Sequence, residues 1–545
     1  MLTKNRADII AGLLLLLMVS TAILSMKDDS ATSDEVAHVI AGYSYLAKND
    51  YRLNPEHPPL LKDLAAIPLL FMDLPFPENS SYWTNDTNGQ WGLGRLFLYE
   101  SGNDADQILF WSRIPTVILM LLLGFYIYKW SIELYGRKAG LLALVLYSFS
   151  PSIITNSRLV TTDLGVTFFI FISFYYFWKL LEKPSKLNFA LATLTFTLAQ
   201  LSKFTAIFLV PIFLLIIMLR HRSLKTFALM MISSLLILGI YYQLHLVGMP
   251  LQVQHQLIGA LPNDETGAFV QYTALARTFL NSMADISLFR PYSHYLLGFF
   301  MAGGHTAGGS GANFFMGVSG VHHWLYNIVG YLVKELLASQ ILLLTAILLA
   351  VKKRGLPQLL TIGIISFCLL LFTIFSAVNL QLGIRYILPI FPFVYMLTSG
   401  QVAGVKVPAL KATTVLLIVW LVASSLLIFP SYLSYYNELV GGPRNGYLYF
   451  VDSNTDWGQD LKRLATYVRD NSINRIKVDY FGGGDPRYYL GDRYVYWDSD
   501  HGPTDGWLAI SASRYQWYRN EYSWLSVYKP VALIGYSILV YNVSR

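Results

Sequence analysis

Apolar runs recur along this 545-residue chain up to about residue 430. Examples are LLLLLM near the start, followed by VILMLLLGF, FLVPIFLLIIML and ILLLTAILLA. Because about 20 apolar residues in a helix cross the hydrocarbon core of a bilayer, such runs indicate membrane spans. The pattern predicts a polytopic α-helical membrane protein with about eleven transmembrane helices, near residues 8–26, 108–129, 139–155, 162–180, 188–202, 204–220, 225–246, 330–351, 358–378, 386–404 and 411–430.

The basic residues of the short loops give these spans an orientation. If the N-terminus is cytoplasmic, every cluster of basic residues lies on the inner side, as the positive-inside rule requires. The clusters are Lys129, Arg137 and Lys138; Lys179, Lys183 and Lys186; Arg220, Arg222 and Lys225; Lys352, Lys353 and Arg354; and Lys406 and Lys411. We therefore expect a multi-pass protein with a cytoplasmic N-terminus. The first apolar run precedes charged MKDDS without a small-residue cleavage site, so we expect a retained span rather than a signal peptide.

Three segments are then expected on the outer side of the membrane: the loops 27–107 and 247–329, and the tail 431–545. In the tail, RIKVDYF and VALIGYSILVYNV alternate as strands do, whereas WGQDLKRLATYVRDN has the pattern of a helix. The sequence thus predicts a transmembrane domain at 1–430 and a small extracytoplasmic α/β domain at 431–545. The second loop contains a Gly-rich stretch at 302–311, which we expect to be flexible.

Composition narrows the class of protein. Hydrophobic residues make up 54% of the chain and charged residues only 13%, whereas an average protein is about a quarter charged. This excludes a soluble enzyme, a nucleic-acid binder and a disordered scaffold. The net charge of +7 needs no acidic partner, since topology places the Lys and Arg residues. The single cysteine, Cys368, allows neither an intramolecular disulfide nor a thiolate metal cluster.

The first outer loop begins with ATSDEVAHVIAGYSYL, which contains two adjacent acids. Thr32 and Glu35 have the spacing of a capping box, and Asp34 and Glu35 would occupy the first helical turn. The alternative interpretation makes one of these carboxylates a general base at the membrane surface. Local sequence does not decide between the two.

The same loop continues with NPEHPPLLKDLAAIP. Pro58 and Pro59 favour an extended approach to a new helix, with Lys62 near its start. Lys62 is either an interfacial anchor or a phosphate ligand beside a helix N-terminus. His57 is a candidate ligand, although a lone histidine is more often structural.

Further basic residues lie where the positive-inside rule predicts few. Arg158 and Asp163 lie at the outer ends of the third and fourth spans, and Lys203 lies between two apolar runs with no acidic neighbour. Arg385 and Tyr386 lie at the outer end of the tenth span. Lys334 is eighteen residues before Lys352, about 27 Å of helix, so it also emerges outside. A transporter would place such groups along a path near the midplane. A cluster at one face suits an enzyme that holds an anionic lipid head group.

Together these motifs resemble those of the GT-C glycosyltransferases. The resemblance rests on the Asp-Glu pair after the first span, His-Pro-Pro-x-x-Lys in the same loop, Arg-x-x-x-x-Asp after the third span and Arg-Tyr-x-x-Pro near the last spans. The group it resembles is that of the protein O-mannosyltransferases and lipid A aminoarabinose transferases. The tail segment YYNELVGGPRNGYLYFVDSNTDWGQDLKRL resembles the extracytoplasmic tail of many bacterial members.

This resemblance implies an enzyme that transfers a monosaccharide from a polyprenyl-phosphate carrier to a hydroxyl at the outer face of a bacterial inner membrane. The acceptor is a protein, a lipid or a glycan. Asp34 would be the general base of an inverting reaction and Glu35 would orient the acceptor or support Asp34. The donor phosphate would bind cationic side chains, namely Lys62, Arg158, Lys203 and Arg385. Other polar groups would position donor or acceptor, namely His57, Asp163, Tyr386 and Lys334.

The chemistry requires no cofactor, because a phosphate leaving group needs only cationic stabilisation. A divalent metal is possible, but the acidic and histidine residues near this face (Glu35, His38, Glu56, His57 and Asp163) lack the spacing of a tight site. The segment DSNTDWGQD lacks the glycine and glutamate of a calcium loop. Two other functions stay open: a transporter or flippase of lipid-linked sugars, and a lipid-linked glycan polymerase or ligase.

Overall fold

The computed structural model describes residues 4–220, 224–261, 270–309, 313–352 and 358–544. Six of its helices are long and apolar enough to cross a membrane. They are α1 (Lys4–Met26), α6 (Ala105–Tyr135), α9 (Asp163–Glu182), α12 (Leu224–His245), α18 (Leu359–Ala377) and α20 (Pro408–Leu427). Two bent helix pairs raise this number to as many as eight. The prediction of a polytopic helical protein is confirmed, while the number eleven stays a prediction.

Three other predicted spans correspond to shorter helices. These are α10 (Lys186–Gln200), α11 (Leu209–Leu219) and α19 (Phe391–Val402). A 3₁₀ turn precedes each of the last two, η3 (Phe204–Phe208) before α11 and η4 (Ile384–Ile390) before α19. Lys203 and Arg385 therefore lie at irregular backbone next to apolar helices.

Two predicted spans are not straight. The span 139–155 is divided into α7 (Arg137–Ser148) and α8 (Pro151–Ser157), bent by 65°. Pro151 starts the new helix, and the Ser150 hydroxyl caps it by accepting a hydrogen bond from the Ile153 N–H.

The span 330–351 is divided into α16 (Tyr326–Lys334) and α17 (Leu337–Lys352), with an angle of 111°. Glu335 is extended at this break, and its carbonyl accepts a hydrogen bond from Asn437 Nδ2 at 2.8 Å. The prediction that one helix joins Lys334 to Lys352 is therefore wrong.

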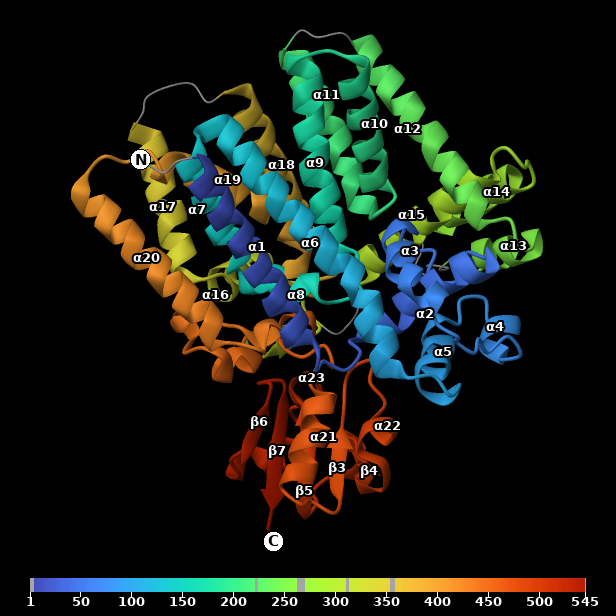
Figure 1. The fold of residues 1–545 in the computed structure, drawn as a ribbon. Coiled ribbons are helices and arrows are strands. Elements are labelled where there is room, and N and C mark those ends of the chain that lie inside the picture. The colour runs from blue at the N-terminus through green and yellow to red at the C-terminus, as the bar shows by residue number, and fades with distance from the viewer. Residues whose placement is uncertain (1–3, 221–223, 262–269, 310–312, 353–357, 545) are drawn as a thin grey trace.

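The outer loops form helices at the end of the bundle that faces the C-terminal sheet, whereas the start of α1 lies at the opposite end (Figure 1). The first loop contains α2 (Ser33–Lys48), α3 (Leu60–Ala66), α4 (Ser81–Thr84) and α5 (Gln90–Arg95). The second contains α13 (Leu251–Gly259), α14 (Val270–Ala284), α15 (Arg290–Gly308) and a small hairpin, β1 (Phe314–Phe315) and β2 (Val318–Ser319). The Gly-rich stretch is helical up to Gly308, and residues 310–312 lie outside the described residues; its flexibility stays a prediction.

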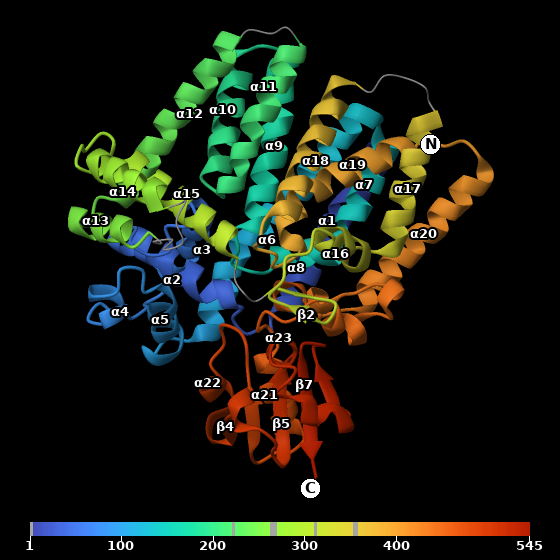
Figure 2. The same cartoon turned by 180° about the vertical axis from the view of Figure 1, so that it is seen from behind.

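The tail contains a mixed sheet that projects from the helical body (Figures 1 and 2). Its strands are β3 (Ile476–Asp479), β4 (Tyr494–Tyr496), β5 (Gly506–Ser511), β6 (Ala532–Ile534) and β7 (Ile538–Val543), in the order β4-β3-β5-β7-β6. β3 is parallel to β4 and β5, and β7 is antiparallel to β5 and β6. The helices are α21 (Leu461–Asp470), α22 (Pro486–Leu490) and α23 (Ala512–Trp517). Both strand predictions and the helix prediction are confirmed.

The tail packs against the start of α2, which bears the two adjacent acids. Ser30 N–H donates to the Gln459 carbonyl, Ser33 N–H to the Trp457 carbonyl, and Gly483 N–H to the Ala31 carbonyl, at 3.0 to 3.2 Å. A β-carbon on Gly483 would lie only 2.2 Å from the Thr32 carbonyl oxygen. Only glycine permits this close approach.

Gly483→Ala should therefore loosen the tail from α2, because the clash is with backbone that cannot rotate away. We expect the free energy of unfolding to fall by about 1–3 kcal/mol. Thermal unfolding of the purified protein in detergent measures this. The control is Gly404→Ala, where an added β-carbon meets nothing within 4 Å. Equal unfolding temperatures for the two variants would contradict the close packing.

Candidate functional site

A cavity of about 470 Å³ lies where the outer loops meet the ends of the spans. Its lining comes from α2, the segment before α3, α5, η3, α15, α18 with the segment after it, and η4. The polar and aromatic lining residues are Asp34, His38, Asn54, Glu56, His57, Gln90, Trp91, Lys203, Phe204, Thr205, His305, Thr306, Phe375, Arg385 and Tyr386. Five of the ten predicted site residues are among them: Asp34, His57, Lys203, Arg385 and Tyr386.

Four charged side chains form a row beside this cavity. Arg385 Nη1 is 2.7 Å from Asp34 Oδ2 and 3.6 Å from Asp163 Oδ2. Lys203 Nζ is 2.6 Å from Asp163 Oδ1. Asp34 is the most exposed member, with 24% of its side chain accessible. The expectation that Lys203 has no acidic neighbour is therefore wrong, because Asp163 begins α9 and reaches it across the site.

Aromatic rings surround the two cations. The Arg385 guanidinium lies 4.2 Å from the ring centre of Trp457, and Lys203 Nζ lies 5.0 Å from that of Tyr386. Trp457 belongs to the tail, in the segment DSNTDWGQD. Asn454 of the same segment accepts a hydrogen bond from the Ile384 N–H at 3.1 Å. The tail thus helps to fix the position of Arg385.

The charge state of Asp34 follows from its neighbours. Burial raises the pKa of the carboxyl, but the nearby cations, Arg385 above all, outweigh burial, so the pKa lies below its ordinary value of 3.8. Asp34 is therefore an anion at neutral pH.

Two histidines lie close together beside Asp34. The rings of His38 and His57 are 5.3 Å apart and nearly perpendicular. Burial lowers the pKa of both rings; Asp34 opposes this effect at His38, and nearby cations add to it at each ring. His38 Nδ1 lies 2.8 Å from the Val160 carbonyl. Both rings are neutral at pH 7, so they offer hydrogen bonds rather than charge.

Glu35 points away from the cavity. It is fully buried, and its carboxylate accepts hydrogen bonds from Arg113 Nε and Nη2 at 2.8 and 2.7 Å, as well as from the Thr32 and Val160 N–H groups. The capping box with Thr32 is confirmed. Both carboxylate oxygens are occupied by protein donors, so Glu35 has a structural position; of its two expected roles, orienting the acceptor or supporting Asp34, this position suits the second.

Lys62, expected to bind phosphate, is also buried outside the cavity lining. Its Nζ lies within 2.9 Å of four acceptors, namely Tyr45 Oη, the Asn54 carbonyl, Asn54 Oδ1 and the His57 carbonyl. Burial lowers the pKa of Lys62 to about 7, although Glu56 and Asp63 oppose this effect. Lys62 therefore fixes the Asn54–His57 turn that lines the cavity.

Arg158 and Lys334 lie elsewhere as well. Arg158 is 1% exposed; it pairs with Asp29 at 3.0 Å and donates to the Ser25 carbonyl at 2.7 Å. Asp29 also pairs with Arg463 of α21 at 2.7 Å, so this chain of charges joins the tail to α1 and α8. Lys334 donates to the carbonyls of Leu433 and Asn454. Neither lines the cavity with Asp34.

The sequence argument missed several residues at or behind the cavity. Arg113 also lies at the outer end of a predicted span, so the argument from misplaced basic residues applied to it too. Trp457 and Asn454 gave no local signal, because their contacts are with residues about seventy positions away.

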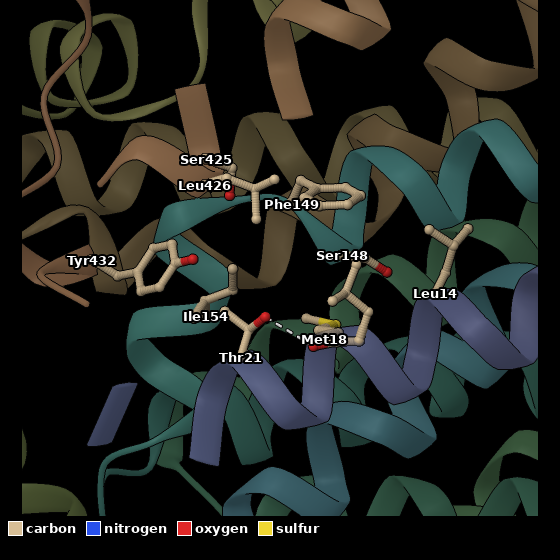
Figure 3. Close-up of a pocket in the computed structure, with 10 residues that line it drawn as sticks. Leu14, Met18, Thr21, Ser148, Phe149, Ile154, Ser425, Leu426 and Tyr432 are labelled. Atoms are coloured by element: carbon tan, nitrogen blue, oxygen red, sulfur yellow. Dashed lines mark hydrogen bonds between the residues drawn. The ribbon is translucent and has the colours of Figure 1, made fainter. Parts of the chain in front are cut away.

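Nothing in the described ranges groups three or more His, Cys, Asp or Glu side chains as a metal site would. Another pocket, drawn in Figure 3, lies between α1, α7, α8 and α20. Its lining is mostly apolar, with Tyr432 as the single titratable residue, and Thr21 Oγ1 there donates to its own helix at 2.8 Å. This pocket lacks the charged groups that Asp34, Lys203 and Arg385 supply.

Comparison with known protein families gives a match over part of the chain. Residues 102–243 match the family model described as dolichyl-phosphate-mannose-protein mannosyltransferase. This segment contains Arg158, Asp163 and Lys203, while the Asp34 and Arg385 motifs lie outside it. None of the curated proteins matches the sequence significantly.

Several solved structures are similar at low identity. ArnT from Cupriavidus metallidurans bound to undecaprenyl phosphate superposes with a TM-score of 0.48 and 12% identity, over 97% of each chain. The Archaeoglobus fulgidus oligosaccharyltransferase gives 0.39 and 12%, over 91% of this chain and 68% of that one. The S. cerevisiae Pmt1-Pmt2 complex gives 0.31 and 17%, over 58% and 36%. Superpositions this loose carry no information about function.

The buried Glu35–Arg113 pair predicts a large effect on stability. Arg113→Met leaves the Glu35 carboxylate without its cation, which costs about 3–5 kcal/mol. A fall in the unfolding temperature in detergent checks this. The control, Lys48→Met, removes the exposed Lys48–Glu78 pair. We expect this change to lower the free energy of unfolding by less than about 1 kcal/mol. An Arg113→Met protein as stable as the control would refute the structural role.

Proposed function

We propose that this chain transfers a monosaccharide from a polyprenyl-phosphate carrier to an acceptor hydroxyl at the outer, periplasmic face of the inner membrane, with inversion. The observation that supports this most is the juxtaposition of Arg385 and Lys203 with the Asp34 carboxylate on one cavity at the ends of the spans. The description of the matched family model names dolichyl-phosphate-mannose, which belongs to the same chemical class as the proposed polyprenyl-phosphate donor.

The two cations provide the donor site. Lys203 and Arg385 both line the cavity, and a phosphate between them would share their positive charge. As the bond from the anomeric carbon to the phosphate oxygen breaks, its electron pair moves onto the phosphate. Cations in a partly buried site stabilise this developing charge more strongly than they would in water. Lys62 lies outside the lining and holds the Asn54–His57 turn in place, whereas Arg158 pairs with Asp29 away from the cavity.

Asp34 is the base in this reaction. The acceptor oxygen forms the new bond to the anomeric carbon from the face opposite the phosphate, and its proton passes to Asp34. Inversion follows from this single displacement. Asp34 is the accessible member of the Asp-Glu pair, and its pKa below 3.8 keeps it ionised.

Arg385 couples donor binding to the strength of the base. Arg385 pairs with Asp34 and also lies at the proposed phosphate site. A bound phosphate therefore shares the positive charge of Arg385 and weakens its interaction with the Asp34 carboxylate. The carboxylate then becomes more basic once the donor is in place. This limits proton removal to the complex in which transfer can occur.

The segment before α3 and helix α5 bring polar side chains to the cavity that suit a sugar. Glu56 accepts hydrogen bonds from Gln90 Nε2 at 2.6 Å and Asn54 Nδ2 at 3.2 Å, and all three residues line the cavity. Sugar hydroxyls both donate and accept, so such a network can bind them. His57 adds a neutral ring on the same side. The reaction requires no metal.

The position of the charges favours a transferase over a flippase of lipid-linked sugars. Asp163 is the first residue of α9, while Lys203 and Arg385 lie in or next to the turns before α11 and α19. A head-group path through the bilayer would need polar groups along the helices. A polymerase or ligase would use a larger donor at the same cavity, and the mass of the bound donor distinguishes the two.

Asp34→Asn should abolish transfer and keep donor binding, because the amide cannot accept the proton but keeps the shape of the site. We expect the transfer rate to fall by at least about a hundredfold, in line with the contribution of general bases. Transfer is measured with a radiolabelled polyprenyl-phosphate sugar, and donor binding by native mass spectrometry. The control is Asp28→Asn, an exposed carboxyl six residues earlier. A fully active Asp34→Asn protein would exclude Asp34 as the base.

Arg385→Gln should move the acidic limb of the pH–rate profile to higher pH. Without Arg385, burial raises the pKa of Asp34 with less opposition, so the base is protonated, and the rate falls, at a higher pH than in the wild type. Rates are normalised to the maximum of each variant. Arg385→Lys, which keeps a cation, should shift the limb less. An unchanged acidic limb in Arg385→Gln would disconnect Arg385 from the ionisation of Asp34.

A further inference from the structure

A second polar cavity, of about 280 Å³, lies in the tail. It opens at the ends of β3 and β4 and beside the helix that follows β5. Its lining residues are Arg95, Val478, Asp479, Tyr480, Gly482, Gly484, Pro486, Tyr494, Tyr496, Trp497 and Arg514. Arg95 belongs to α5 of the first outer loop, so this cavity is built by both the loop and the tail.

The topology of the sheet makes this a favoured place for a ligand. β3 is central among the three parallel strands, with β4 on one side and β5 on the other. After β3 the chain forms β4 on one side of it and then β5 on the other side. This change of direction creates a switch point at the carboxyl ends of the strands. Ligands of open α/β sheets bind in this crevice. Asp479 ends β3, and Arg514 lies in α23, directly after β5.

The polar groups of the cavity are mainly hydrogen-bond donors. Both carboxylate oxygens of Asp479 are occupied, by Arg514 Nε at 2.7 Å and Tyr522 Oη at 2.6 Å. Within the described residues, no acceptor binds the terminal nitrogens of Arg514, and Arg95 forms no ion pair. The buried indole nitrogen of Trp497 also lacks a partner there. A matching ligand must supply acceptors, most simply an anionic group.

Aromatic rings supply the rest of the wall. Tyr494 and Trp497 are half-buried and Tyr496 is 59% exposed, so flat side chains face a cavity that is partly open to solvent. The ring of Tyr494 stacks on no other ring among the described residues. Aromatic faces bind the apolar faces of sugar rings, while the guanidinium groups bind carboxylate or phosphate.

We propose that this cavity binds a saccharide that bears a carboxylate or a phosphate group. Its volume lies near the lower limit of small-molecule pockets, roughly 300–1,000 Å³, which suits one or two sugar rings. The Gly482–Gly484 loop lines the cavity, and Gly483 within it contacts Thr32 at the start of the helix that bears Asp34. The saccharide is therefore the acceptor, or the part of it that anchors the acceptor near the base. This last assignment rests on the proposed transferase function.

The test measures by saturation-transfer NMR whether small sugars bind directly to the full-length protein in detergent, in the absence of donor. The probes are glucuronic acid, glucose 6-phosphate, glucose and inorganic phosphate. We expect saturation of the ring protons of at least one charged sugar. Glucose should bind about tenfold more weakly, because it cannot form the charge-assisted contact. The charged sugar should bind about tenfold more weakly to Arg95→Met, because that variant loses the same contact. Tyr494→Ala should also weaken charged-sugar binding. The charged sugar that binds shows whether the anion is a carboxylate or a phosphate.

The matched control is Arg475→Met, an exposed arginine just before β3 at the opposite end of the same strand. It should bind the charged sugar as the wild type does. The proposal is overturned if neither charged sugar binds, if Arg95→Met binds equally well, or if inorganic phosphate binds as tightly as glucose 6-phosphate. Because donor and transfer play no part in the assay, sugar binding without any transfer activity would refute the transferase and leave this site in place.

Discussion

The ion pair between Arg385 and Asp34 joins residues 351 positions apart and determines the shape of the site around it. A buried cation at the end of apolar helices is costly unless it is paired, and here Asp34 and Asp163 together compensate Arg385 and Lys203. The requirement for pairing brings α2, α9, η3 and η4 to one point. The two carboxylates then differ in access: Asp163 is buried between the cations, while Asp34 faces the cavity.

The tail completes this arrangement. Trp457 covers the Arg385 guanidinium, Asn454 fixes the backbone before it, and Gly483 packs on the start of α2. A buried chain of charges from Arg463 through Asp29 to Arg158 ties α21 to the helical body. The residues that position the proposed catalytic groups thus come from both ends of the sequence. A change in the tail can alter the site without touching a lining residue.

Much of the fold could be predicted from the sequence because hydrophobic periodicity reports local structure. The long apolar helices and strands such as β3 and β7 follow directly from it. The bend at Glu335 could not be predicted in this way, since it depends on Asn437, about a hundred residues later. For the same reason the run 330–351 looked like a single span.

The candidate site was predictable only in part. Lys203 and Arg385 were identified because basic residues at the outer ends of apolar runs are unusual, and Asp34 was identified by the resemblance; all three line one cavity. Sequence could not show that Asp163 pairs with Lys203, or that Lys62 is enclosed by four protein acceptors. Local sequence also could not show that Arg113 occupies Glu35 while Asp34 stays accessible. In each case the deciding contact is far away in the sequence.

The most direct measurement is an experimental structure of the Asp34→Asn protein with a polyprenyl-phosphate monosaccharide. The account predicts the donor phosphate between Lys203 and Arg385, with the anomeric carbon facing residue 34. A phosphate bound elsewhere, for example at Lys334 or Arg158, with the cavity beside residue 34 filled by neither sugar nor phosphate, would contradict it.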